Sequence, residues 1–184
     1  MYSIRNYNPK DSEDIKRICI ETANGIFRKK MFERPLLDVY CRYYIEQEPE
    51  SCFVVIDEND NVKGYILCAK NYEKYRKNFK EKYLKQKNPV TFFLGKFAMD
   101  EMRGFSKEYP AHLHIDLLPE CQGQGFGRKM IGLLISHLRE QRIPGVILDV
   151  GIDNVGAQVF YEKCGFEVLY VGKYDVLMGM KIGE

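Results

Sequence analysis

The chain has 184 residues, which is typical of one domain and short for two. Its 28 basic and 26 acidic residues leave a formal net charge of +2, so the chain lacks the basic excess expected of a protein that grips a nucleic-acid backbone. Hydrophobic residues make up 45% of the chain, enough to bury a core and to exclude a disordered protein. We expect one folded domain over residues 1–184 that binds no nucleic acid.

The cysteines and the N-terminus indicate the compartment. Six cysteines are scattered through apolar stretches, without a C-x-x-C pair or a histidine at metal-ligand spacing, which predicts reduced core thiols and no metal site. Residues 1–7 turn polar too early for a signal peptide, and no run of about 18 apolar residues occurs. We expect a cytoplasmic protein that does not associate with membranes.

The first 48 residues predict a strand followed by two helices. Residues 2–7 alternate as a short strand, and the polar turn that ends it offers Asp11 as the N-cap of the first helix. A second helix is predicted over 35–48, because apolar residues recur there at helical spacing. These residues are Leu36, Val39, Tyr40, Tyr43 and Tyr44.

The middle of the chain predicts a hairpin, followed by a region whose pattern fits more than one structure. Residues 52–56 and 62–69 flank a polar turn, as in a β-hairpin. Residues 70–87 carry eight basic and two acidic residues and predict either a surface helix with an aromatic inner stripe or a basic rim for an anionic ligand. The stripe consists of Tyr72, Tyr75, Phe79 and Tyr83. The stretch 91–110 fits a flap over a site or a long connection.

From residue 112 onward, strands alternate with single helices. The pattern predicts strands at 112–118, 146–150, 166–171 and 175–180, and helices at 125–142 and 154–164. One helix joins the first two of these strands, which are therefore predicted to be parallel and connected by a right-handed crossover. The residues alone thus predict an α/β fold.

A glycine-rich loop lies between the first of these strands and its helix. Gly123, Gly125 and Gly127 free the backbone to turn several N–H groups into one concavity, and the helix that follows adds the positive end of its dipole. This combination predicts a pyrophosphate cradle. The dinucleotide fingerprint fails because Arg128 stands where its third glycine is required, and no Gly-Lys-Ser/Thr completes a P-loop. A tight turn without a ligand is the alternative for the glycines taken alone.

The glycine loop indicates a particular protein family only when it is considered together with a second segment. Gln122-x-x-Gly-x-Gly is followed downstream by Asn154-x-x-Ala-x-x-Phe160-Tyr161-x-x-x-Gly165-Phe, and the pair resembles the GCN5-related N-acetyltransferase (GNAT) family. The match covers roughly residues 112–171. It implies an α/β fold with a mixed, mostly antiparallel central sheet flanked by helices, in which one parallel strand pair splays apart. We expect 112–171 to form an acetyl-CoA-binding core, with 70–111 as a candidate acceptor-side insertion.

The resemblance also implies which residues hold acetyl-CoA. The loop would supply backbone donors to the pyrophosphate, and the strand edge before it would pair with the pantetheine arm. The N–H of Leu117 would polarise the thioester carbonyl, and Asn154 would hydrogen-bond the pantetheine, although Asn154 fits an ordinary helix cap equally well. The expected cofactor-binding residues are Leu117, Leu118, Gln122, Gly123, Gln124, Gly125, Phe126, Gly127, Arg128 and Asn154.

Catalytic roles are expected for Tyr161, His114 and Asp116. In the family the corresponding tyrosine lies near the sulfur, and a phenol of pKa about 10 can protonate a departing thiolate; a purely structural hydroxyl is the alternative. Direct attack needs an uncharged amine, so another group must accept a proton. His112, His114 and Asp116 share strand parity and face one side of a regular strand. Relatives carry a similar His-x-His strand at about one residue's offset, and a slip of one residue would reverse the face.

The sequence leaves the roles of several other residues undecided. Glu101, Glu108 and Glu120 are further candidates for the proton acceptor, and His137 is expected to face solvent. Cys121 beside the loop lacks a visible histidine partner, which disfavours a covalent acyl-cysteine route. The aromatic residues of the second helix and the stretch 92–109 frame the acceptor opening or simply pack in the core.

The resulting hypothesis is an N-acetyltransferase that moves acetyl from acetyl-CoA to a primary amine of a small molecule or a peptide by direct attack. The alternatives are a non-catalytic coenzyme-binding module and a nucleotide-dependent enzyme that uses the glycine loop. The acceptor and the proton acceptor are not defined by the sequence, and a homodimer is left open.

Overall fold

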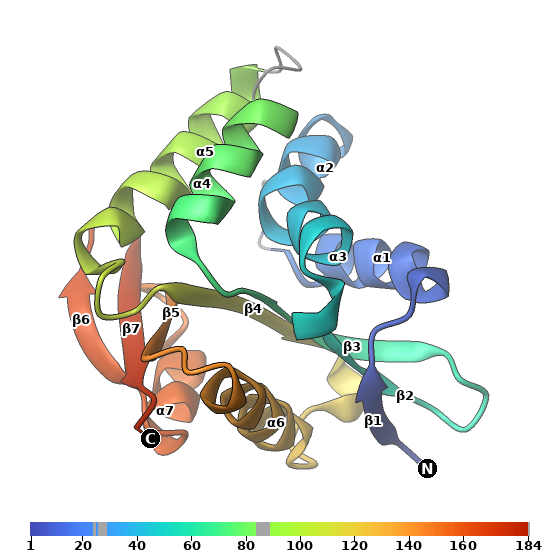
Figure 1. The fold of residues 1–184 in the computed structure, drawn as a ribbon. Helices are drawn as coiled ribbons and strands as arrows, with labels where there is room; N and C mark the ends of the chain where they lie inside the picture. Colours follow the sequence, from blue (N-terminus) through green and yellow to red (C-terminus); the bar gives the residue numbers. More distant parts are fainter. Residues whose placement is uncertain (24, 26–28, 84–88, 184) are drawn as a thin grey trace.

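A seven-stranded sheet forms the centre of the molecule (Figure 1). The computed structural model describes residues 1–23, 25, 29–83 and 89–183. The strands are β1 (Ser3–Asn6), β2 (Phe53–Ile56), β3 (Val62–Ala69), β4 (Ala111–Leu117), β5 (Gly145–Gly151), β6 (Glu167–Val171) and β7 (Asp175–Lys181), in the order β1-β2-β3-β4-β5-β7-β6. Only the β4–β5 pair is parallel among these neighbours, which confirms the predicted mixed, mostly antiparallel sheet.

Helices cover both faces of this sheet, as Figure 1 shows. One face carries α1 (Ser12–Thr22), α2 (Lys30–Leu37), α3 (Tyr43–Gln47), α4 (Tyr72–Lys82) and α5 (Pro89–Met102), and the other carries α6 (Phe126–Glu140) and α7 (Val155–Lys163). The two main hydrophobic clusters lie on opposite sides of the strands, one under α1 to α4 and one under α6 and α7. The sheet is therefore the middle of three layers, and its inner strands are buried on both faces.

The predicted helix over 35–48 begins earlier and is interrupted. It starts at Lys30, with Pro35 inside α2, and a π-helical turn over Asp38–Arg42 separates α2 from α3. Proline has no N–H to donate in the helix interior, and a π turn accommodates one extra residue. Tyr43 and Tyr44, which directly follow the turn, are both buried in the core, as their place on the predicted apolar stripe requires.

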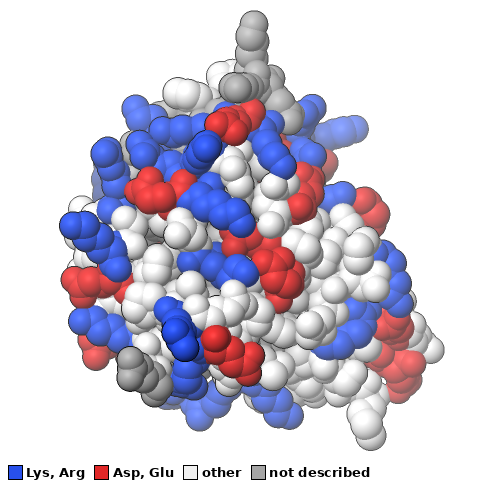
Figure 2. Space-filling model, in the orientation of Figure 1, with Lys and Arg blue, Asp and Glu red and all other residues white. Residues whose placement is uncertain are grey.

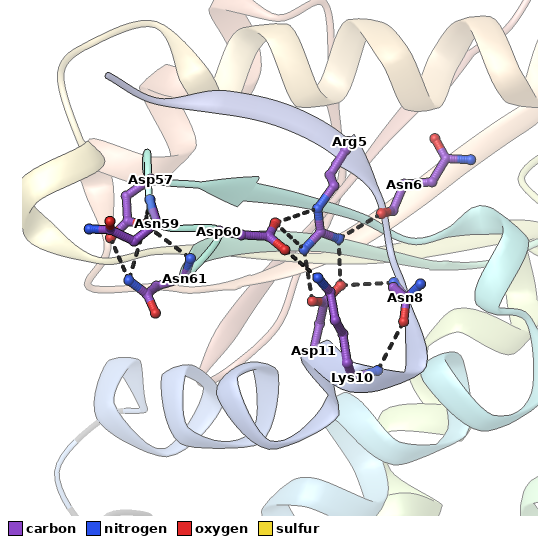
Figure 3. Close-up of polar contacts among 9 residues, drawn as sticks. All are labelled: Arg5, Asn6, Asn8, Lys10, Asp11, Asp57, Asn59, Asp60 and Asn61. Carbon is purple, nitrogen blue, oxygen red and sulfur yellow. Dashed lines mark hydrogen bonds and ion pairs between the residues drawn. The ribbon is translucent and has the colours of Figure 1, made fainter.

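Asp11 occupies the predicted boundary but does not cap the helix. Its backbone is already helical, and its side chain makes no capping hydrogen bond to α1. Instead it accepts hydrogen bonds from Arg5, at 2.7 and 2.9 Å, and from the N–H of Asn8 at 2.8 Å (Figure 3). Asp60 shares the same guanidinium. The buried carboxylate thus joins β1 to the start of α1, and it completes a capping box with Asn8 around the short 3-10 turn Pro9–Asp11 that precedes α1.

Residues 70–111 form two helices where the sequence predicted one. The four aromatic side chains of the predicted stripe are buried along α4, while its lysines are exposed on a face where basic and acidic residues are interspersed (Figure 2). Residues 84–87, the end of the predicted helix, lie outside the described part of the chain. The expected flap or connection is instead α5, followed by a short 3-10 turn over Arg103–Phe105. Its apolar residues form no clear stripe, so the helical period was not visible.

The strand β4 carries its polar side chains toward α1, α3 and α4, as the predicted parity requires. His114 Nε2 lies 2.9 Å from the Tyr44 hydroxyl, and the Tyr65 hydroxyl donates to Asp116 at 2.5 Å. His112 is fully enclosed, with its ring edge-on to Tyr75 at a centroid distance of 4.4 Å. Neither ring nitrogen of His112 has a hydrogen-bond partner among the described residues. This side chain therefore costs the folded state desolvation energy without a compensating hydrogen bond.

We expect the His112→Leu variant to be less sensitive to acid than the wild type. Burial lowers the pKa of His112 to about 3, whereas a histidine in the unfolded chain has a pKa of about 6.5. As the pH falls below about 6.5 only the unfolded state binds this proton, so stability is lost on the way down to pH 3. The fall in unfolding free energy between pH 7 and pH 4.5, measured by urea denaturation, should shrink by about 1–3 kcal/mol.

His137→Leu is the matched control, because His137 is only half-buried and should give a smaller change. An unchanged acid response in His112→Leu would contradict the burial of a neutral imidazole at this position.

Candidate active site

The parallel strands β4 and β5 separate almost as soon as they meet. They are paired only at Ala111 with Val146 and at His112 with Ile147, and beyond these residues they diverge. A pocket of about 270 Å³ lies in the opening and is lined by both strands together with residues of α1, α7 and the π turn. Its polar lining residues include Thr22, Tyr40, His114, Asp116, Asp149, Asn154 and Tyr161. The predicted splayed pair is therefore present, with side chains of two helix layers meeting in it.

The glycine loop at the end of β4 has the geometry of an anion cradle. Gly125 is the N-cap of α6 with φ +82°, a left-handed conformation that L side chains rarely adopt, and open space lies where its Cβ would be. Residues 122–125 are exposed. The N–H groups of residues 123–128 donate to no backbone oxygen in the described part of the chain. Free N–H groups at the N-terminus of a 15-residue helix fit a pyrophosphate.

A close contact holds this loop against α7. A Cβ on Gly127 would lie 2.9 Å from the ring of Phe160, so only glycine permits the observed approach of the two helices. Phe160 directly precedes Tyr161, and the contact therefore connects the loop to the tyrosine in the pocket. Arg128 is exposed, and its guanidinium lies 3.4 Å from the carbonyl oxygen of Lys163. Arg128 is therefore close to the loop, and its contact with Lys163 is long for a hydrogen bond.

The two leucines before the loop differ in where their backbone points. The N–H of Leu118 donates to Lys63 on the β3 side, and its carbonyl accepts from Cys121, so both backbone groups are used. Backbone groups alternate along a strand, which directs those of Leu117 toward the gap. The Leu117 carbonyl there accepts a hydrogen bond from Gln122 Nε2 at 2.9 Å. Leu117, and not Leu118, thus presents a backbone N–H to the opening, and Gln122 braces that strand end.

Tyr161 enters the pocket from α7. Its ring packs on Phe166 with centroids 5.7 Å apart, and the side chain is half-buried. Burial, together with the nearby charges of Asp116 and Asp149, raises the pKa of the phenol, so it stays protonated at neutral pH. Asn154 also lines the pocket, and its side chain caps α7 by accepting from the Ala157 N–H at 3.2 Å. Residues of the second predicted segment therefore line the pocket, and the end of the glycine loop is joined to that segment by the contact of Gly127 with Phe160.

Three titratable groups face Tyr161 from the strands. Burial lowers the pKa of His114 to about 4, so the imidazole is neutral and bonded to Tyr44. Burial raises the pKa of Asp116, and the Tyr65 hydrogen bond opposes this shift. Burial and the neighbouring Asp175 raise the pKa of Asp149 to about 6. Sequence reasoning missed Asp149, although one acidic residue within the apolar stretch Gly145–Gly151 was a visible signal.

Other predicted candidates lie elsewhere. Glu120 pairs with Lys63 on the surface, Glu108 pairs with Lys181, and the side chain of Glu101 lies outside the described residues. Cys121 is fully buried, and burial raises the pKa of its thiol. His137 is not solvent-facing as predicted: it is half-buried, and its Nε2 lies 3.0 Å from the Ser51 hydroxyl.

Of the three tyrosines predicted to frame the acceptor opening from the second helix, one lines the pocket. Tyr43 and Tyr44 are buried in the core, whereas Tyr40 lines the pocket with its ring edge-on to His114, at a centroid distance of 5.0 Å. Within the described part of 70–111, no residue lines this pocket. The described residues hold no group of His, Cys, Asp and Glu that could bind a metal ion, and none of their helices has the length and apolar character to span a membrane.

Comparison with known proteins agrees with this architecture. Residues 19–166 match the model of the acetyltransferase (GNAT) family. N-alpha-acetyltransferase 30 of Schizosaccharomyces pombe is 24% identical over 158 residues, which are 86% of this chain and 81% of that protein. The crystal structure of SsHAT superposes with a TM-score of 0.87 at 26% identity, over 100% of this chain and 99% of that one. The fold of yncA from Salmonella typhimurium, solved with its cofactor acetyl-CoA, is similar at a TM-score of 0.62 and 17% identity, over 100% of this chain and 95% of that one. The chain belongs to the GNAT family of acetyltransferases.

Proposed function

We propose that the protein is an N-acetyltransferase that moves acetyl from acetyl-CoA to a primary amine of a small molecule or a peptide by direct attack. The observation that carries the proposal is the split between β4 and β5, which opens a pocket with a protonated phenol on one side and carboxylates on the other. The cradle of N–H groups follows β4, one of the two strands that line this pocket. Acetyl-CoA supplies the activated thioester for this reaction.

The chain offers a distinct group for each part of that cosubstrate. The N–H groups of residues 123–128 and the guanidinium of Arg128 would bind the diphosphate. The free edge of β4 would pair with the pantetheine arm, and the Leu117 N–H would polarise the carbonyl as negative charge develops on its oxygen. Asn154 would add a side-chain contact beside its capping role. Holding both reactants in this opening replaces a bimolecular encounter, which is expected to contribute most of the rate.

Proton transfer is assigned to the side chains in the pocket. Tyr161 would protonate the departing sulfur, since its raised pKa keeps the proton on the phenol. Asp116, fixed by Tyr65, and His114, fixed by Tyr44, lie on the acceptor side and would orient the amine. No covalent acyl-enzyme is required, which agrees with the burial of Cys121.

The proposal also covers the class of acceptor, the role of residues 70–111 and the cellular compartment. A peptide amine is favoured because the matched relative of Schizosaccharomyces pombe is an N-alpha-acetyltransferase. We place residues 70–111 on the acceptor side as support for the π turn, because Thr91 Oγ1 of α5 lies 3.4 Å from the Asp38 carboxylate at its start. All six cysteines are free, which fits a reducing compartment such as the cytoplasm.

The Tyr161→Phe variant should lose turnover while keeping its fold. Phenylalanine preserves the packing on Phe166 but has no proton for the sulfur, so kcat should fall about 100-fold or more. The KM for acetyl-CoA should change less than about threefold, because ground-state binding is retained. Release of free thiol in the presence of an amine library measures both constants.

Tyr170→Phe, at an exposed tyrosine of β6, is the matched control and should leave kcat unchanged. Full turnover by Tyr161→Phe would remove the phenol from the mechanism. A wild type that binds coenzyme A but releases thiol with none of the amines would instead indicate a non-catalytic binding module.

Coenzyme binding can be tested at Gly125 with two substitutions of equal size that differ in charge. Aspartate and asparagine both tolerate the left-handed backbone at this position better than other L residues, and open space surrounds the Cβ. Only Gly125→Asp places a negative charge beside the proposed diphosphate. Coenzyme A at about 100 times its Kd should stabilise the wild type and Gly125→Asn by about 2.7 kcal/mol in thermal unfolding, and Gly125→Asp far less.

NAD and ATP complete the same panel of thermal-unfolding measurements. Stabilisation by either nucleotide with no effect of coenzyme A would select a nucleotide-dependent enzyme. Equal stabilisation of Gly125→Asp and Gly125→Asn by coenzyme A would show that the diphosphate does not bind at the loop.

A further inference from the structure

We propose that Asp149 binds the ammonium group of the acceptor and takes its proton, and that this pocket therefore selects α-amines of peptides over free amino acids. The inference rests on the proposed acetyltransferase function and adds its acceptor class. It concerns a residue on β5 that no motif of the sequence singled out.

The register of the strands places Asp149 opposite the acceptor-side residues of β4. Ile147 pairs with His112, and Asp149 follows two residues later on the same face of the sheet. At that level β4 has already moved away, so Asp149 and Asp116 form facing walls of one pocket. The backbone of Asp149 pairs with Leu177 of β7, which fixes the carboxylate on an inner strand. Tyr161 approaches the same space from α7.

The charges of the lining select the kind of acceptor. Asp116 and Asp149 are acidic, and none of the described residues that line the pocket is a lysine or an arginine. A cationic amine therefore finds two carboxylates, whereas the carboxylate of a free amino acid finds no counter-charge and would approach like charges in a partly buried space. A peptide or an amino-acid amide carries the same α-amine without that carboxylate.

Among the described residues, Asp149 has fewer side-chain hydrogen bonds than Asp116, so its carboxylate is more available to a ligand. Asp116 accepts the hydrogen bond of Tyr65, while no side chain in the described part of the chain is hydrogen-bonded to Asp149. Asp175 of β7 shares the same face and lies close enough to raise its pKa. Other titratable groups that line the pocket or act electrostatically on Asp149 come from α1, the π turn, α3, α4, β4 and α7. They are Cys19, Tyr40, Tyr44, Tyr75, His114, Asp116 and Tyr161.

The proton affinity of Asp149 matches an α-amine better than an alkyl amine. With a pKa of about 6, Asp149 lies about 2 pKa units below a peptide α-amine and more than 4 below a lysine-type amine. Transfer of the first proton is thus unfavourable by about 100-fold for the α-amine and by more than about 10,000-fold for the alkyl amine. His114, with a pKa of about 4, is a poorer acceptor for either.

The protons and bonds balance in this scheme. Asp149 takes one proton from the ammonium and passes it to solvent, which leaves a lone pair on nitrogen. That lone pair forms the bond to the carbonyl carbon, and the carbon–sulfur bond breaks. Tyr161 gives its proton to sulfur, and the second proton lost from nitrogen replaces it. The net products are an acetylated amine, coenzyme A and one proton released to water.

The test compares alaninamide, an alanine-initiated peptide and free alanine as acceptors for the wild type and Asp149→Asn. The wild type should acetylate the amide and the peptide with a kcat/KM at least about 100-fold above that for alanine. At pH 7 the Asp149→Asn variant should lose about 100-fold in kcat/KM for the amide and less for alanine, so the preference shrinks. The loss for the amide should diminish above about pH 8, where the α-amine is already neutral.

Asp14→Asn is the matched control, because Asp14 lies on the outer side of α1, where it pairs with Arg17. Folding of Asp149→Asn is checked by thermal unfolding. The raised pKa means that the folded protein binds a proton between about pH 4 and pH 6 that the unfolded chain does not, so wild-type stability falls as the pH rises through that range. Removing the charge should therefore leave Asp149→Asn at least as stable as the wild type at pH 7.

Several results would overturn the inference. A folded Asp149→Asn variant with undiminished kcat/KM for alaninamide at pH 7, or with the wild-type preference and pH profile, would exclude this role of Asp149. Equal acetylation of alanine and alaninamide by the wild type would exclude the proposed selectivity. Both results differ from the failure of the proposed function, in which the wild type acetylates none of the acceptors.

Discussion

The early separation of β4 from β5 is the constraint on which the rest of the structure depends. Two neighbouring strands that stop pairing leave N–H and C=O groups on their facing edges, and each such group costs about 1–3 kcal/mol if it stays buried without a partner. Here the edge is opened to a pocket, and the Leu117 carbonyl is satisfied by the side chain of Gln122. In the proposed function the remaining edge pairs with the extended arm of the cosubstrate.

The same separation brings together side chains that an intact sheet would keep apart. Asp116 and Asp149 belong to the face covered by α1, whereas Tyr161 belongs to α7 on the opposite face. Packed layers lie about 10 Å from one another, so these groups meet only where the sheet is open. The acid–base chemistry we propose is thus a consequence of the strand geometry and does not need a flexible loop to assemble it.

Aromatic residues with polar tips support the side of the pocket that faces α1 and α3. Tyr44 lies within hydrogen-bond distance of His114, Tyr65 bonds Asp116, and Tyr43 donates to the buried carboxylate of Glu48 at 3.1 Å. Each contact combines a buried ring with a satisfied hydroxyl, which fixes the orientation of its partner. His112 departs from this pattern, since its ring is packed among tyrosines without a hydrogen bond in the described chain. The network therefore orders the pocket at a cost in acid stability.

The sequence by itself determined the alternation of strands and helices from residue 112, the hairpin strand over 62–69 and the glycine loop, because periodicity, turn residues and glycine spacing are local properties. Tertiary structure decided what local patterns do not encode. The Asp11 carboxylate bonds Arg5 and the N–H of Asn8 and does not cap α1, and α5 formed without a visible apolar stripe. Asp149 acquired its place only when β4 diverged from its strand, since the surroundings of a side chain depend on neighbours that are remote in sequence.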